Sequence, residues 1–545
     1  MFLIPFVSFA VCYSLGQPMG PTGITALQSS IIAAILFITF IIFAFKNKLT
    51  FSIEMLPYLA MPVILFISIN KKLEFASYDM LLCFSMFVST LIVFSQKEIY
   101  SKWVFRSMII CGNLHLLMQI FGIIINNRGI TIRSLFPMAN EIMFFYMLVM
   151  FSSILVFCKD NAFWKRYATA IGILVFLSLV IGETIETGKF EVTTEHAVGI
   201  WLGLGCGILF TLDLFVWKNL NLPKKLGLSI TALIFLAWML TPIAVINYNF
   251  LSFNRSEATT RLDNWQAAWN LIREEPLGVG FGAYGANIMH HWPTIEENYH
   301  KTGYGAVVFT AAHNQYLQIL TETGWPGWLY YCALFAVPWF VSVFRYLKTG
   351  KTHFLFIAGM LASMLSVMEL SEAISMFAFI QIIHWIFLLY CVRALLPLRA
   401  KPRNFTITGV AHNLFFIALI SLFSYLSYDR GKQLYSIHLT DLFTRERFLD
   451  PVSLNNALEV HPKNSGALWW LWQFQLHQRK FEDALKTLEK IEHISGTLWS
   501  VDQVRAEIYY EMGNMEKACE AAKFPMARFN DAWTVSFKEK LNCGN

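Results

Sequence analysis

The chain has 545 residues, of which 56% are hydrophobic and only 14% are charged. Soluble globular proteins carry about 25% charged residues, so this composition excludes an ordinary soluble domain and predicts a polytopic membrane protein. The net charge of +6 does not indicate a nucleic-acid partner, because the placement of basic residues in a membrane protein matters more than their sum. We therefore expect a lipid bilayer, and no nucleic acid, as a partner.

In chain order the sequence divides into four parts, at 1–250, 251–324, 325–428 and 429–545. The first and third are apolar, the second is a polar loop rich in glycine and histidine, and the fourth is a soluble tail. Runs of about 17–25 apolar residues can cross a bilayer. Thirteen candidates lie near 2–15, 23–45, 53–70, 78–96, 105–126, 138–158, 164–183, 195–217, 226–249, 325–347, 353–370, 374–396 and 405–428. The sequence thus predicts an all-α fold, a membrane bundle of about 13 helices with a large loop and a helical tail.

Basic residues alternate from loop to loop. Six loops hold 18 Lys and Arg residues, whereas the five short loops between them hold 5. Because basic loops stay in the cytoplasm, the N-terminus is predicted inside, and the loop 251–324 and the tail outside. In a bacterium this places a multi-pass chain in the inner membrane with its loop and tail in the periplasm.

The long loop begins with a predicted helix over Arg261–Pro276. Trp265, Ala268 and Ile272 recur with helical spacing and form its apolar face. Arg261 lies one turn before Trp265 on that face, where a guanidinium must be paired or must meet an anionic ligand. An arginine that reaches out to water at the start of the helix is the alternative.

Four glycines follow this helix, at positions 278, 280, 282 and 285. A Gly-rich loop can hold a phosphate with its backbone N–H groups, but the flanking sequence matches no nucleotide-binding motif. Tight packing at the membrane surface explains the glycines equally well. The loop also contains four histidines, whose spacing matches no zinc motif, so no metal site is predicted.

The loop ends in the stretch TAAHNQYLQILTETGWPGW, Thr310–Trp328, which leads into an apolar run. His313, Asn314 and Gln315 stand side by side in it, and Glu322 precedes a Gly-Trp-Pro-Gly break. These polar groups are predicted to stand at the boundary between water and lipid. Aromatic residues typical of that boundary follow, at Trp325, Trp328, Tyr330 and Tyr331.

The tail contains an internal repeat. Two of its stretches, Leu476–Lys490 and Tyr510–Phe524, align at a period of 34 residues. A helix–turn–helix unit of that period resembles tetratricopeptide repeats. The tail is then either a platform for docking proteins or a structural cap, and the sequence leaves both open. A disulfide between Cys519 and Cys543 is also left open.

Two patterns in the long loop resemble the O-antigen ligase superfamily. The first is His313-Asn314, a nine-residue spacer, and then Gly324 and Gly327. The second is the arginine-led helix followed by Pro-Leu-Gly-Val-Gly at 276–280. Both stand in an outside loop between membrane segments, which is where the superfamily carries them.

The resemblance implies that His313 is the catalytic base and that Arg261 stabilises a diphosphate leaving group. It implies neither a metal nor a nucleotide cofactor. Further substrate-binding residues are expected from the resemblance or from their position at the outer ends of membrane segments, at Asn314, Gln315, Arg133, Asn140, Trp265 and Glu369. The stretch from Arg133 to Asn140 departs from the usual arginine–asparagine pattern, and Trp265 stands where some ligases have leucine.

Superfamily members transfer a glycan from undecaprenyl diphosphate to an acceptor on the periplasmic face. The long tail resembles the PglL-type protein O-oligosaccharyltransferases, so the resemblance implies inverting transfer of a preassembled oligosaccharide to Ser or Thr of a periplasmic protein such as pilin. A lipid A-core O-antigen ligase or a polysaccharide polymerase is the alternative within the superfamily. A transporter, disfavoured by the absence of internal symmetry, and a scaffold with an inactive membrane domain are the alternatives from other classes.

Overall fold

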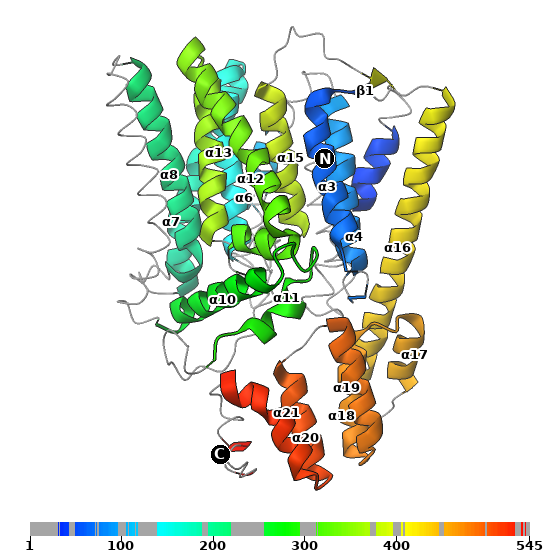
Figure 1. The fold of residues 1–545 in the computed structure, drawn as a ribbon. Coiled ribbons are helices and arrows are strands. Elements are labelled where there is room, and N and C mark those ends of the chain that lie inside the picture. The colour runs from blue at the N-terminus through cyan, green and yellow to red at the C-terminus, as the bar shows by residue number, and fades with distance from the viewer. Residues whose placement is uncertain are drawn as a thin grey trace.

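A computed structural model shows a helical bundle that carries a smaller helical tail at one end (Figure 1). The structure describes residues 31, 33–42, 50–70, 72–73, 76–95, 105–106, 108–114, 116–117, 139–187, 194–219, 255–294, 312, 314–370, 378–395, 405–406, 409–445, 452–495, 499–528, 536–537 and 540. Two predicted membrane segments, near 2–15 and 226–249, lie outside these residues, and each of the others overlaps a described helix.

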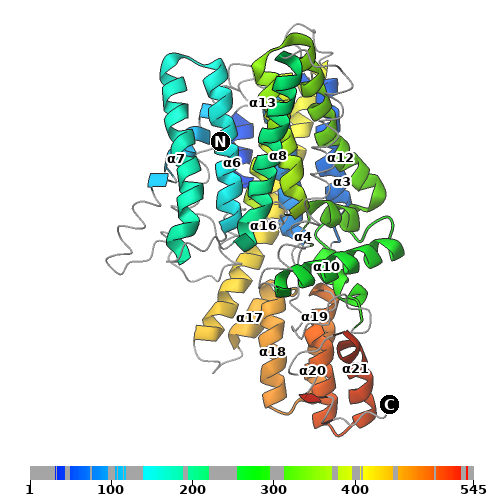
Figure 2. The same cartoon turned by 90° about the vertical axis from the view of Figure 1, so that its left-hand side faces the viewer.

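The helices of the bundle lie side by side along its long axis (Figures 1 and 2). In chain order they are α3 (Leu56–Ser68, after a 3-10 turn at Ile53–Met55), α4 (Ala76–Ser95), α6 (Ala139–Lys159), α7 (Ala162–Thr187), α8 (Thr194–Asn219), α12 (Gln315–Thr349), α13 (Thr352–Leu370), α15 (Ala378–Leu395) and α16 (Gly409–Arg445). By length and apolar composition α4, α12 and α16 could each cross a membrane. The predicted helical bundle is therefore present, while the count of thirteen spans stays a prediction.

Helices α8 and α13 pack at close range because small residues face each other. A Cβ atom added at Gly207 would stand 1.9 Å from the Ser363 hydroxyl oxygen, and one added at Gly359 would stand 1.9 Å from the Thr211 hydroxyl oxygen. Any side chain at either glycine would push the helices apart. Small residues at helix crossings are typical of membrane bundles.

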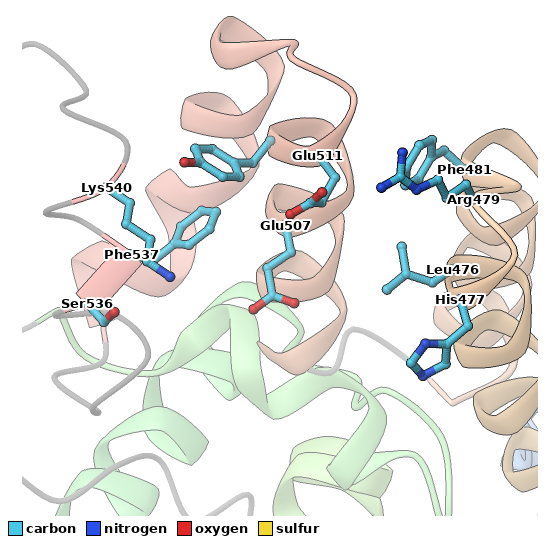
Figure 3. A pocket seen from close by; sticks show the side chains of 10 residues that line it. Leu476, His477, Arg479, Phe481, Glu507, Glu511, Ser536, Phe537 and Lys540 are labelled. Atoms are coloured by element: carbon cyan, nitrogen blue, oxygen red, sulfur yellow. The ribbon is translucent and has the colours of Figure 1, made fainter.

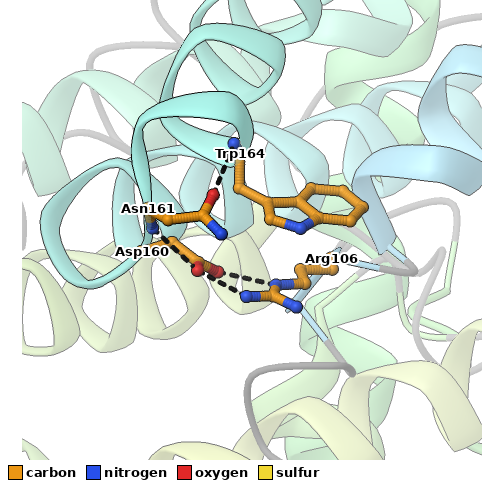
Figure 4. A network of polar contacts seen from close by, with 4 residues as sticks. All are labelled: Arg106, Asp160, Asn161 and Trp164. Carbon is orange, nitrogen blue, oxygen red and sulfur yellow. Dashed lines mark hydrogen bonds and ion pairs between the residues drawn. The ribbon is translucent and has the colours of Figure 1, made fainter.

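An ion pair joins the turn between α6 and α7 to the segment that contains Arg106 (Figure 4). Arg106 Nε donates to Asp160 Oδ2 at 2.7 Å, and Nη2 donates to the other carboxylate oxygen. The guanidinium lies 4.8 Å from the centre of the Trp164 ring, and Asn161 caps α7 by accepting the Trp164 N–H. Because the guanidinium bonds both carboxylate oxygens, it joins the segment that contains Arg106 to the α6–α7 turn. Both are predicted to be cytoplasmic.

A short antiparallel ladder makes a second link between connecting segments. Thr50 pairs with Thr406 and Phe51 with Phe405, forming β1 (Thr50–Phe51) and β2 (Phe405–Thr406). Among the described residues these are the only strands, a small departure from the all-α prediction. The ladder joins the segments before α3 and α16, which the charge pattern predicts to lie together in the cytoplasm.

The tail contains two equivalent helix hairpins. They are α18 (Ser465–His477) with α19 (Phe481–Ser495), and α20 (Trp499–Glu511) with α21 (Met515–Arg528), after α17 (Val452–Val460). Arg479 and Gly513, 34 residues apart, both have left-handed backbone, with φ of 58° and 75°. Arg479 N–H donates to Leu476 O, and Gly513 N–H makes the same bond to Tyr510 O. The predicted repeat is thus present, and its membership of the tetratricopeptide family stays a prediction.

Helix α16 carries the chain from the bundle into the tail without a break. The predicted boundary between 428 and 429 lies inside this helix of 37 residues. Just past it, Arg430 is 2% exposed, and its guanidinium lies 5.2 Å from the centre of the Tyr78 ring at the start of α4. The tail therefore begins as the extension of a membrane helix that is packed against the bundle.

Candidate functional site

The predicted site lies at the end of the bundle that carries the tail (Figure 1). Helix α10 (Arg255–Glu274), helix α11 (Tyr284–Asn287), the 3-10 turn η2 (Ile288–His291) and the start of α12 form a layer there. The helix predicted over Arg261–Pro276 is observed as α10, six residues longer at its start and two shorter at its end. The tail lies at the same end of the bundle as this layer, which agrees with the prediction that both are outside.

The structure describes the predicted site residues to different extents. Side chains are described for Trp265, Asn314 and Gln315. A helical position alone is described for Arg261 in α10, Asn140 in α6 and Glu369 in α13. His313 and Arg133 lie outside the described residues. The site is therefore built from the residues on either side of His313.

Asn314 is the N-cap of α12. Its side-chain oxygen accepts the backbone N–H groups of Tyr316 at 3.0 Å and Leu317 at 3.1 Å. Asparagine is among the best residues for this role, because it satisfies N–H groups that have no partner within the helix. Asn314, the residue after His313, therefore fixes the start of the helix at Gln315.

Ala312, the residue before His313, is held at both of its backbone polar groups. Trp265 Nε1 donates to the Ala312 carbonyl oxygen at 2.9 Å. The Ala312 N–H donates to Gln318 Oε1 at 2.8 Å. Trp265 was predicted as a site residue, and Gln318 was missed. Together with the Asn314 cap, these bonds fix the chain immediately before and after His313.

Gln318 belongs to a ring of buried polar groups that returns to α10. Its amide nitrogen donates to Glu322 Oε1 at 2.5 Å, one helical turn further along. The Glu322 carboxylate, 3% exposed, also accepts the backbone N–H groups of Gly282 and Tyr284. The Tyr284 hydroxyl in turn donates to Asn264 Oδ1 at 2.6 Å, next to Trp265. Buried polar groups that are fully paired rigidify a site.

Backbone contacts explain the glycines of the loop. The N–H of Val279 donates to Thr321 O at 3.0 Å, and that of Gly280 donates to Glu322 O at 2.9 Å. A Cβ at Gly278 would stand 2.5 Å from the Gly324 nitrogen. The donors that a phosphate would need are thus already engaged with the chain. Packing, and not a phosphate cradle, is the role of this segment.

Gly324 kinks α12 where it leaves this layer. Its φ of 67° and ψ of −176° interrupt the helical geometry, and a Cβ there would stand 2.4 Å from the Leu277 carbonyl carbon. Beyond the kink Trp325 is 41% exposed, while Tyr331 is only 6% exposed. The predicted aromatic boundary therefore includes Trp325 but not Tyr331, whose hydroxyl contacts the Met368 sulfur.

A cavity of about 70 Å³, mainly apolar but with several polar side chains in its lining, lies between α3, α4, α12, α15 and the Gly-rich segment. Gln315 lines it and is 4% exposed, and its Oε1 has no hydrogen-bond partner within the described residues. Asp79 and Glu322 line the same cavity and both contact Gly282. Asp79 was missed, although an acidic residue at the start of an apolar run is itself a functional signal. The described residues contain no cluster of three or more side chains suited to a metal ion.

The tail contacts this layer. The Phe524 ring of α21 lies 5.3 Å from the His290 ring of η2, edge to face. Burial raises the pKa of the nearby Asp502 carboxyl, and the Arg505 guanidinium is the main group that opposes that rise. His290, which matches no motif, therefore serves as a contact between loop and tail. Cys519 of α21 is disulfide-bonded, and its partner lies outside the described residues.

Comparison with known proteins identifies the layer. Residues 192–332 match the family model described as O-antigen ligase. The range contains α10, the Gly-rich segment and the start of α12, and it excludes Arg133, Asn140, Glu369 and the tail. No curated protein matches the chain. The match confirms the resemblance to O-antigen ligases and supports transfer of a lipid-linked glycan by an integral membrane enzyme.

Proposed function

We propose that this chain, with its O-antigen ligase domain at 192–332, transfers a preassembled oligosaccharide from undecaprenyl diphosphate to Ser or Thr of periplasmic proteins such as pilin. The observation that carries the proposal is the fixation of Ala312 by Trp265 and Gln318, directly before the histidine of the motif. The donor's diphosphate lies at the membrane surface. A catalytic group must therefore be held at that depth, and the bonds to Ala312 would hold the neighbouring histidine there. A lipid A-core O-antigen ligase or a polysaccharide polymerase is the alternative.

In the proposed reaction His313 is the general base. Neutral imidazole takes the proton of the acceptor hydroxyl as its oxygen attacks the anomeric carbon. The bond from that carbon to the diphosphate oxygen breaks, and the lipid diphosphate leaves with the electron pair. Direct displacement inverts the anomeric carbon. The sugar–phosphate bond is already activated, so the step uses neither a nucleotide nor a metal.

Arg261 is the proposed clamp for the diphosphate. It lies in α10 one turn before Trp265, so the helix that holds Ala312 also carries the arginine. A guanidinium can make paired hydrogen bonds to phosphate oxygens and stabilise their growing charge. Additional contacts to donor or acceptor are proposed for the remaining predicted residues, Arg133, Asn140, Gln315 and Glu369.

The tail supports a protein acceptor. It contacts the site layer at His290 and carries a groove of about 400 Å³ between its two hairpins. Figure 3 shows Glu507 and Glu511 across the groove from Arg479, with Lys540 on the same side as the glutamates. A groove lined by both acidic and basic side chains suits a polypeptide segment with side chains of both signs. A lipid acceptor would reach the site through the bilayer and would not need this groove.

The test uses the purified full chain in vesicles, with a lipid-linked oligosaccharide, EDTA and no nucleotide. Pilin and lipid A-core are offered as acceptors in separate reactions. We expect glycosylated pilin, loss of about 10²–10⁴-fold in His313→Ala, and parent-like activity in the matched variant His353→Ala at the start of α13. Glycan on lipid A-core alone would establish the alternative. Parent-like transfer by His313→Ala would contradict the assigned base.

A further inference from the structure

Exposed apolar side chains gather where α10 meets the kink of α12. Trp269 and Trp325 are each 41% exposed, Leu277 is 77% exposed and Leu329 is 59% exposed. The Trp269 and Trp325 rings meet edge to face at 6.3 Å, and Trp325 meets Trp328 in the same way at 5.6 Å. We name these five residues the interface patch. Contiguous exposed apolar surface of this kind marks a contact site.

The interface patch continues the exposed apolar face of α12. Beyond it, α12, which is long and apolar enough to cross a membrane, exposes Val337, Phe340 and Phe344, at 58%, 61% and 67%. Leu329 lies between these residues and Trp325 on the same helix. This continuity identifies the occupant of the interface patch as the bilayer itself.

The charge beside the patch agrees with this occupant. The Arg273 guanidinium lies 5.7 Å from the centre of the Trp269 ring, and the residue is exposed. The neighbouring Glu274 is directed elsewhere, with its carboxylate 3.6 Å from His291 Nδ1. Tryptophan with a nearby basic group is typical of segments at the level of lipid headgroups.

We propose that the interface patch inserts into the headgroup region of the bilayer, so that the C-terminal end of α10 lies in the membrane surface with Arg273 against lipid phosphates. This inference does not depend on the proposed reaction. It has a consequence for the site, because Trp265 lies one turn before Trp269 and holds Ala312. The depth of the patch then sets the height of the histidine motif above the lipid phosphates.

The test measures depth with nitroxide labels on the full chain in phosphatidylethanolamine–phosphatidylglycerol vesicles. The probe is Leu277→Cys, with Phe340→Cys as a reference in lipid and Glu482→Cys in the tail as a reference in water; the signal of the labelled parent is subtracted. Collision with oxygen reports lipid, and collision with a nickel chelate reports water. We expect an oxygen-to-nickel ratio at Leu277 severalfold above that at Glu482 and below that at Phe340.

Two outcomes would overturn the inference. A ratio at Leu277 equal to that at Glu482 would place the patch in water, and a label shielded from both reagents would place it under protein. Brominated lipids give a second measurement without a label at the patch. Quenchable tryptophan emission should fall in Trp269→Phe and stay unchanged in Trp472→Phe, whose ring is buried in the tail. Equal quenching of the parent and Trp269→Phe would also reject the proposal.

Discussion

Replacing Trp265 by Phe isolates one hydrogen bond beside the proposed catalytic histidine. The phenyl ring keeps most of the apolar packing, while the N–H that donates to Ala312 O at 2.9 Å is lost. A hydrogen bond of this kind contributes about 0.5–1.5 kcal/mol to the free energy of unfolding, so the unfolding midpoint should fall only slightly. A shift of about 1 Å near the reacting groups can cost about 10²-fold in rate. We therefore expect kcat to fall by about 10- to 100-fold with little change in KM.

The assay measures transfer from the lipid-linked donor alongside thermal unfolding of the same preparation. Trp339→Phe in α12 is the matched control, because the Trp339 indole N–H has no hydrogen-bond partner within the described residues. That control should keep the parent's kcat. If Trp265→Phe also kept it, the bond to Ala312 would not position His313 and the reasoning would be refuted. A large loss of stability in Trp265→Phe would show instead that the bond is structural.

Three further predictions concern topology, the kink and the tail. A reporter fused after Asn545 should be active only when exported, and one at Lys224 only when cytoplasmic; a shared location would reject the thirteen-segment topology. Gly324→Ala should reduce the yield of folded protein far more than Gly409→Ala, because both glycines have positive φ but only Gly324 would clash with neighbouring backbone. Deletion after Arg445 should abolish transfer to protein while donor binding persists, and unchanged transfer would make the tail a structural cap.

Local patterns were enough to predict the elements of the site. The spacing of Trp265, Ala268 and Ile272 predicted α10, and the structure places Trp265 against the chain beside His313. Apolar run length predicted the long helices of the bundle, because the thickness of a bilayer sets such a length, and three of them could cross a membrane. The repeat predicted the tail hairpins, because the turns at Arg479 and Gly513 stand at equivalent positions of the 34-residue period although their residues differ.

Pairing between distant residues could not be predicted in the same way. Glu322 stood out in the sequence, yet its bonds to Gly282 and Tyr284 join segments about forty residues apart. Asn314 is chemically suited both to binding a sugar and to capping a helix, and only the backbone geometry identifies the cap. The glycine-rich segment posed the same ambiguity. Its composition allows a phosphate cradle. The N–H groups of Val279 and Gly280 donate to backbone carbonyls instead, which shows that the segment packs against α12.

The unbroken course of α16 sets how far the end of this helix stands from the membrane. Its 37 residues extend about 55 Å at 1.5 Å per residue, whereas the hydrocarbon core of a bilayer is about 30 Å thick. If α16 crosses the membrane, about 25 Å of rigid helix extends beyond the hydrocarbon core. This length separates the C-terminal end of α16 from the lipid. If the acceptor is a protein, as proposed, a folded acceptor in the groove between the tail hairpins would stand away from the lipid, although Phe524 of α21 contacts His290 in the site layer. Such an acceptor would offer its hydroxyl on an extended or flexible segment that reaches the site layer, so the length of that segment would contribute to the choice of substrate.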